Sequence, residues 1–231
     1  KAEYYYNLGL AYAKLDENDN AINSYKDALR LKEAYPEAYF NCGLLYMQKK
    51  DYQNALLCFE PILKYEPDNI NAIHNLGVVH SKLGNPEKAI DFYRRGLQYE
   101  PDNAELYFNI GVACAKMEKW QDALESYRQA LDIDPKNIKV RSNIAVAYSK
   151  LGETRKSEEE YKYILKLNPD YAEVWFNLGV NYAKDDDYEN AVYAYEQAVK
   201  AQPSYSEAFF NLAIAYNRVS KPEKAVEAYE K

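Results

Sequence analysis

The stretch FNLGVN, residues 176–181, decides the fold because its first four positions recur along the whole chain. The matching segments are YNLG at 6–9, FNCG at 40–43, HNLG at 74–77, FNIG at 108–111, SNIA at 142–145 and FNLA at 210–213. Consecutive copies lie 34 residues apart without exception. A fixed period of this length is typical of repeat proteins, whose units cannot bury their apolar faces alone and must stack on one another.

Other positions keep the same period. Twelve residues after each copy comes a small side chain, at Ala21, Ala55, Ala89, Ala123, Ser157, Ala191 and Ala225. Four residues later comes an aromatic one, at Tyr25, Phe59, Tyr93, Tyr127, Tyr161, Tyr195 and Tyr229. Proline closes most units, at Pro67, Pro101, Pro135, Pro169 and Pro203. Small and bulky residues at fixed helical phases let two helices approach closely, so each unit is predicted to be a helix pair that the proline ends.

The recurring Leu-Gly, Tyr, Ala, aromatic, Ala and Pro positions resemble the tetratricopeptide repeat (TPR) family, over roughly residues 2–231. The resemblance implies an all-α fold, a right-handed α-solenoid of stacked antiparallel helix pairs whose first helices line a concave groove. It also implies the family's usual activity, which is to hold partner proteins or peptides. The expected single array, 1–231, divides into repeats 2–35, 36–69, 70–103, 104–137, 138–171, 172–205 and a truncated 206–231.

Departures from the repeat predict local changes. Pro36 comes three positions later than the closing proline of other units, so that turn should differ. Pro61 lies inside the second helix of its repeat and should kink it, because proline cannot donate to the carbonyl of Leu57. Arg141 and Ser157 replace an aromatic residue and Ala, which predicts a weak joint in the fifth repeat. The truncated last unit leads us to expect a piece of a longer protein.

Asparagine is the least expected part of the pattern. It occupies one phase of every first helix, at Asn7, Asn41, Asn75, Asn109, Asn143, Asn177 and Asn211. Asn is a mediocre helix former, and a buried amide would need partners for its donors and its acceptor. An exposed amide can donate to a peptide carbonyl and accept from a peptide N–H at once. We call this row the Asn ladder, and we interpret it as a grip on the backbone of an extended ligand, unless it is a feature of the family's scaffold.

The spacing suits such a grip. Stacked helix pairs advance by about 8–10 Å, and an extended chain covers about 3.3 Å per residue. One Asn would therefore meet about every third residue of the ligand.

Apolar residues flank the ladder. Before each Asn stands Tyr6, Phe40, His74, Phe108, Ser142, Phe176 or Phe210. Four residues after these come Leu10, Leu44, Val78, Val112, Val146, Val180 and Ile214, which we call the aliphatic stripe. The resemblance places both phases in the groove, where they would contact ligand side chains. The competing interpretation is that they pack between adjacent first helices as core.

Basic residues close most first helices, at Lys14, Lys82, Lys116, Lys150, Lys184 and Arg218. The helix dipole favours cations at this end, which is one explanation. The other is a basic rail that prefers acidic partners.

Several function classes find no support. The net charge of −7 argues against nucleic-acid binding, and no apolar run is long enough to span a membrane. Cys42, Cys58 and Cys114 are odd in number and lack paired spacing, which favours a cytoplasmic or other reducing compartment over a disulfide framework. His74 and His80 lie on different helical faces, so neither a metal nor another cofactor is expected.

The sequence therefore favours a non-catalytic scaffold that binds an extended peptide or partner segment. No Gly-rich phosphate loop or Ser/His/Asp set supports an enzyme in its own right. Because the ladder resembles the superhelical repeats of protein O-glycosyltransferases, a substrate-recognition arm of a larger enzyme is the second hypothesis. Self-association through uncapped repeat ends is the third.

Overall fold

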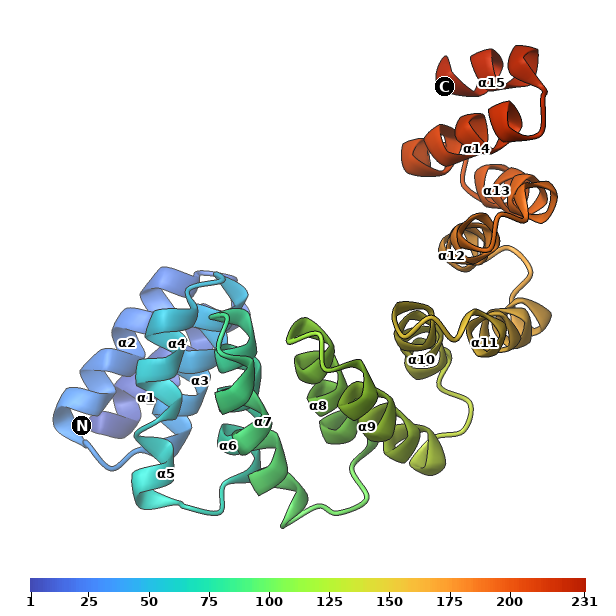
Figure 1. Cartoon of the computed structure of the whole chain (residues 1–231). Helices are drawn as coiled ribbons and strands as arrows, with labels where there is room; N and C mark the ends of the chain where they lie inside the picture. Colours follow the sequence, from blue (N-terminus) through green and yellow to red (C-terminus); the bar gives the residue numbers. More distant parts are fainter. The chain divides into compact units, whose positions relative to one another are not determined.

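The computed structural model describes residues 1–231 and is entirely helical (Figure 1). It divides into two compact units, Lys1–Met117 and Glu118–Lys231. The helices of the first unit are α1 (Ala2–Lys14), α2 (Asn18–Leu31), α3 (Pro36–Gln48), α4 (Tyr52–Phe59), α5 (Ile62–Tyr65), α6 (Ile70–Lys82), α7 (Pro86–Leu97) and α8 (Ala104–Lys116). Those of the second are α9 (Trp120–Ile133), α10 (Ile138–Lys150), α11 (Thr154–Leu167), α12 (Ala172–Lys184), α13 (Tyr188–Ala201), α14 (Ser206–Arg218) and α15 (Pro222–Tyr229).

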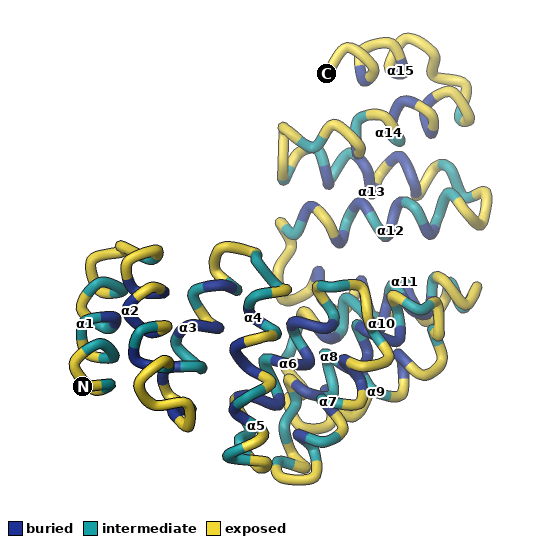
Figure 2. The backbone as a smooth tube through the Cα atoms, turned by 90° about the vertical axis from the view of Figure 1, so that its left-hand side faces the viewer, coloured by how far each residue is buried: buried dark blue, intermediate teal, exposed yellow.

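Packing follows chain order in both units. In the first unit α1 packs on α2, α2 on α3, α3 on α4, α4 on α6, α6 on α7 and α7 on α8. In the second unit the same succession runs from α9 to α15. Buried residues lie where successive helices face one another (Figure 2). The predicted all-α fold of stacked helix pairs is therefore confirmed.

The turn inside each pair has one repeated geometry. The residue at one phase always has a positive φ: Asp16, Lys50, Gly84, Glu118, Gly152, Asp186 and Ser220. After six of these residues the next amide N–H donates to the carbonyl five residues earlier, for example Asp51 N to Tyr46 O at 2.9 Å and Asp187 N to Tyr182 O at 2.9 Å. This bond is the signature of a Schellman cap. Only two of the seven positions carry glycine, so five side chains are held in the left-handed region.

In each repeat described below, the small residue of the first helix packs against the aromatic residue of the second helix in the core. A Cβ added at Gly43 would lie 2.7 Å from the ring of Phe59, and one at Gly179 would lie 2.6 Å from the ring of Tyr195. A side chain at that distance would force the ring or the helix to shift, so the glycine lets its helix rest on the ring. The small residue that marks each repeat is thus selected by the aromatic residue sixteen positions later.

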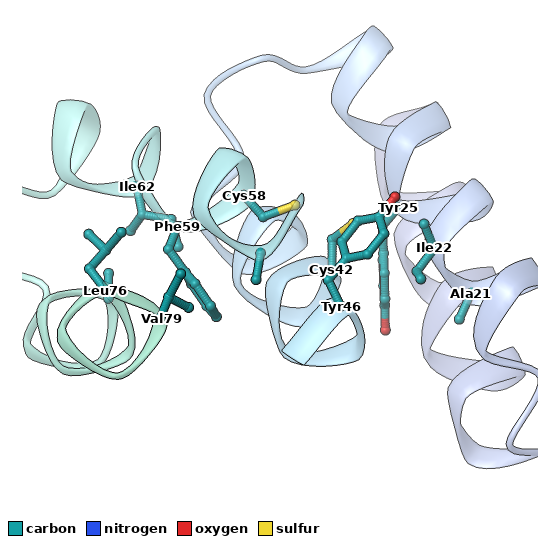
Figure 3. Close-up of a cluster of buried hydrophobic side chains, with 12 residues drawn as sticks. Ala21, Ile22, Tyr25, Cys42, Tyr46, Cys58, Phe59, Ile62, Leu76 and Val79 are labelled. Atoms are coloured by element: carbon teal, nitrogen blue, oxygen red, sulfur yellow. The ribbon is translucent and has the colours of Figure 1, made fainter. Parts of the chain in front are cut away.

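The core of the first unit continues from one helix pair to the next (Figure 3). Tyr25 of α2 and Cys42 of α3 belong to the same buried cluster as Cys58 of α4 and Leu76 of α6. All three cysteines are buried and no disulfide joins them. A cluster shared between neighbours is what makes stacking obligatory.

Pro61 interrupts its helix as predicted. Helix α4 ends at Phe59, and α5 resumes at Ile62. At the start of α5, Lys64 N donates to Pro61 O at 3.1 Å, a bond one residue shorter than the α-helical one. The missing N–H of proline is the cause.

Pro36 acts differently from the prolines that close other units. It is the first residue of α3, where a fixed φ and a missing donor cost nothing. It starts a helix rather than ending one, so the turn differs as expected.

Arg141 of α10 takes over contacts that an aromatic residue makes elsewhere. Its Nη2 donates to Pro135 O at 3.3 Å, as Trp175 Nε1 donates to Pro169 O at 2.7 Å. The guanidinium also pairs with Glu160 Oε2 at 2.9 Å. Only its Nε is buried without a partner. The fifth repeat is therefore joined by polar contacts at the position where the sequence predicts a weak joint.

Candidate functional site on the first helices

Three rows of residues share one face of the first helices. Asn75, Val78 and Lys82 stand at positions i, i+3 and i+7 of α6, and the same spacing recurs in α8, α10 and α12. None of the seven ladder asparagines is buried, and Lys82, Lys116, Lys150 and Lys184 are all exposed. The aliphatic stripe is partly exposed, reaching 39% at Leu44. The predicted site residues in these rows therefore lie on accessible surface within each unit.

Three ladder amides bond to their own helix. Asn75 Nδ2 donates to Asn71 O at 2.8 Å, and Asn143 and Asn211 donate in the same way to the carbonyl four residues earlier, at 2.8 and 2.9 Å. Asn143 Oδ1 also receives a long bond of 3.5 Å from Tyr127. Such local bonds are weak competitors for a ligand because they satisfy only one of the two N–H groups.

Two ladder amides bond to the preceding repeat. Asn41 Nδ2 donates to Tyr6 Oη at 3.0 Å, and Asn109 Nδ2 lies 3.4 Å from His74 Nε2. Asn7 and Asn177 make no side-chain hydrogen bond in the structure. These four side chains, of Asn7, Asn41, Asn109 and Asn177, each keep a free carbonyl oxygen and at least one free N–H. A peptide group requires this pair of an acceptor and a donor.

The aromatic phase before the ladder is more buried than the sequence suggests. Phe176 is only 8% exposed, and its ring lies 5.1 Å from that of Tyr205, which precedes the next first helix. Tyr6 lies 5.0 Å from Tyr35 in the equivalent arrangement. The prediction that Phe176 faces an open groove is wrong, because the next repeat covers it. Phe210 is 57% exposed, while Phe40, His74 and Phe108 are half-buried.

A hollow adjoins the ladder in the first unit. Its volume is about 300 Å³, and it is lined by Tyr6, Pro36, Glu37, Phe40, Asn41, Glu66, Asn69 and Asn71. Amides, carboxylates and an aromatic edge are all present, so both backbone groups and a small side chain of a ligand find partners here.

The lysines contact the preceding first helix. Lys116 Nζ donates to Ser81 Oγ at 3.1 Å and to Ser81 O at 3.2 Å, and Lys184 Nζ donates to Ser149 Oγ at 2.8 Å. Burial lowers the pKa of Lys184, and the neighbouring Lys150 lowers it further, while Asp185 acts in the opposite direction. Lys184 is therefore crowded by the like charge of Lys150.

A second cavity, which the sequence does not predict, lies among α11, α12 and α13. Its volume is about 420 Å³, and it is lined by Lys162, Leu165, Lys166, Trp175, Leu178, Tyr182, Asn190 and Tyr193. Tyr193 stands edge-on to Trp175, with ring centroids 5.8 Å apart, and is 54% exposed. The only sequence signal was an aromatic residue at an outward phase of a second helix.

The structure offers no metal centre. No group of three or more His, Cys, Asp or Glu side chains is arranged to hold an ion. His74 Nε2 has a single carboxylate neighbour, Glu105 Oε1 at 3.7 Å. None of the helices combines the length and hydrophobicity that crossing a bilayer requires.

Family models match along most of the chain. A model described as anaphase-promoting complex, cyclosome, subunit 3, matches residues 48–130. Three tetratricopeptide repeat models match residues 14–50 with 113–152, residues 143–204 and residues 194–227. No curated protein matches the sequence significantly.

Solved structures share the fold at low identity. A tetratricopeptide repeat protein from Parabacteroides merdae superposes with a TM-score of 0.81 at 18% identity, over 99% of this chain and 91% of that one. YrrB, described as a TPR protein with an unusual peptide-binding site, gives 0.65 at 20% identity, over 80% and 95%. The anaphase-promoting complex heterotetramer Cut9–Hcn1 gives 0.67 at 17% identity, over 93% and 42%. With the 34-residue period and the stacked helix pairs, these matches identify the chain as a tetratricopeptide repeat protein.

Proposed function

We propose that this protein is a non-catalytic scaffold that holds an extended peptide or partner segment on the face of its first helices. The Asn ladder grips the ligand backbone, and the aliphatic stripe contacts its side chains. TPR folds commonly mediate protein interactions, and one structural neighbour is described as having a peptide-binding site.

The observation that carries the proposal is the accessibility of the ladder. Leu76 and Gly77 follow Asn75 directly and are buried, whereas Asn75 itself is partly exposed. Packing within the stack therefore does not require an amide at this phase. Each amide with a free oxygen and a free N–H can form two hydrogen bonds to one peptide group, worth about 1 kcal/mol each.

The ladder alone does not supply high affinity. Ordering a flexible ligand costs several kcal/mol, so the aliphatic stripe must contribute as well. Because Phe176 is covered by the next repeat, the exposed apolar contacts come from stripe residues such as Leu44 and Ile214.

A peptide array tests the proposal. Unstructured peptides of varied sequence are screened against the protein, and binders are measured by fluorescence anisotropy. Replacing Asn75, Asn109 and Asn177 by Ala should weaken binding and leave the melting temperature nearly unchanged. A control variant replaces exposed asparagines away from this face, Asn20, Asn23 and Asn168. Equal affinities of the two variants remove the ladder from the mechanism.

Both alternatives from the sequence stay predictions. A substrate-recognition arm of a larger enzyme, such as a protein O-glycosyltransferase, would use the same face. Self-association is checked by sedimentation at two protein concentrations.

A further inference from the structure

One constellation of side chains occurs twice, 68 residues apart. The Ser81 cluster consists of Ser81, Lys82 and Lys116, and the Ser149 cluster consists of Ser149, Lys150 and Lys184. In both, the lysine that closes one first helix donates to the serine hydroxyl of the preceding one, at 3.1 and 2.8 Å. Each unit holds one cluster, and each cluster lies wholly within its unit.

Neither cluster contains a counter-ion. The ion pairs of the structure involve other cations, and none of the four cluster lysines has a carboxylate oxygen within 4.0 Å. This is unexpected in a chain that carries 36 acidic side chains against 29 basic ones. Lys150 Nζ lies over the ring of Trp120, 6.0 Å from its centroid, and the remaining donors of the ammonium groups are left to solvent or a ligand.

A buried network fixes the Ser149 cluster. Ser149 Oγ donates to Asn181 Oδ1 at 2.6 Å, and Asn181 is 1% exposed. Asn181 Nδ2 in turn donates to Ser157 Oγ at 2.7 Å, and Ser157 Oγ donates to Ala145 O at 2.7 Å. Because the Ser149 proton is used by Asn181, the oxygen is left to accept from Lys184. The lysine is thereby positioned from the core outward, which reduces the ordering cost of binding an anion.

The clusters adjoin the proposed peptide site. Asn177 and Lys184 lie on one face of α12, about 10 Å apart along the axis at 1.5 Å per residue. A long acidic side chain on a ligand that crosses the ladder, together with the lysine side chain, spans that gap. A basic ligand residue would be repelled there, and a neutral one would gain no ion pair.

We infer that the Ser81 and Ser149 clusters are carboxylate-binding sites that select acidic peptides, with Glu or Asp side chains of the ligand seated against the cluster lysines. The inference rests on the proposed peptide-binding function and names its ligand class. It also explains why lysine pairs stay uncompensated on an acidic protein.

Two labelled peptides test the inference, (Ser-Glu-Ala)₆ and its neutral match (Ser-Gln-Ala)₆. The protein should bind the Glu peptide at least about tenfold more tightly at about 50 mM salt, and this preference should shrink at about 500 mM salt. A preference for the Glu peptide is informative because the net charge of −7 opposes binding of an acidic peptide unless cations are concentrated locally.

Charge reversal locates the site. The variant Lys150→Glu/Lys184→Glu should lose about tenfold or more in affinity for the Glu peptide and little for the Gln peptide. The control Lys136→Glu/Lys200→Glu changes the net charge equally, on exposed lysines of the turn between α9 and α10 and of α13. The pair Lys82→Glu/Lys116→Glu tests the Ser81 cluster in the same way.

The outcomes separate the two proposals. If both peptides bind equally well, or the control loses as much as the cluster variants, the carboxylate sites are refuted and the scaffold function stands. If neither peptide binds, the sequence-tolerant grip of the ladder fails, and the carboxylate sites fail with it.

Discussion

Ser157 Oγ and Asn181 Nδ2 lie 2.7 Å apart, and both side chains are buried, at 0% and 1% exposure. They come from α11 and α12, in successive repeats. All six other repeats carry Ala at the phase of Ser157, and none carries a polar residue at the phase of Asn181. The two departures are therefore one feature, because each polar group satisfies the other.

The pair predicts a non-additive response to mutation. Asn181→Ala alone should lower the free energy of unfolding by about 1–3 kcal/mol, because it removes buried bonds of Ser157 and Ser149. Adding Ser157→Ala should recover part of that loss, since it restores the small residue found in other repeats. Urea unfolding of both single variants and the double variant measures the coupling. If the losses in unfolding free energy of the two single variants simply add up in the double variant, the proposed coupling of Ser157 and Asn181 is wrong.

The glycine that faces an aromatic ring predicts a steric cost. A Cβ at Gly9 would lie 2.5 Å from Tyr25 Cε1, so Gly9→Val should lower stability by about 1–3 kcal/mol through overpacking. Ala11→Val in the same helix faces solvent and should change stability by less than about 0.5 kcal/mol. Thermal unfolding of the two variants makes the comparison. Similar effects would mean that the close approach is not the cause.

The repeated turn predicts opposite effects of glycine at equivalent positions. Lys50 has φ 58°, so Lys50→Gly should raise stability by up to about 1 kcal/mol. Gly84 has φ +79° with open space beside it, so Gly84→Lys should lower stability by a similar amount, from backbone strain alone. Chemical denaturation of both variants tests the pair, and two changes of the same sign would contradict it.

His80 predicts a pH dependence. It is buried against Phe92, its Nδ1 lacks a partner, and burial lowers its pKa from 6.5, with Lys88 adding to the effect and Glu60 opposing it. The folded state therefore disfavours the charged imidazole. Below pH 6.5 the unfolded chain binds a proton that the folded chain resists, so stability falls as the pH falls through this range.

A tyrosine variant isolates the contribution of His80. His80 stands at the repeat position that Tyr46 and Tyr148 occupy in other repeats, so a tyrosine in the variant His80→Tyr should fit the site. The variant should lose stability less steeply than the wild type between about pH 6.5 and 5, by at most about 1.4 kcal/mol per pH unit. Denaturation midpoints across this range measure the difference. Parallel pH profiles would exclude His80 as the source.

The sequence determined the helix pairs, their order and the kink at Pro61. These features follow from local causes: helical periodicity, the geometry of proline, and small residues that recur opposite aromatic ones. The rows of Asn, aliphatic and Lys residues were also visible, because positions i, i+3 and i+7 of one helix share a face whatever the helix packs against. None of this required knowledge of contacts between repeats.

Only the tertiary structure decided which side chains are covered and which polar groups meet. Phe176 reads like Phe40 in sequence, yet the next repeat buries the first and leaves the second partly exposed. Asn181 is the last residue of the stretch FNLGVN, residues 176–181, but its hydrogen-bond partners Ser149 and Ser157 lie 32 and 24 residues away in the sequence. Burial and hydrogen-bond partners at such positions depend on how neighbouring repeats fit together, which a one-dimensional period does not specify.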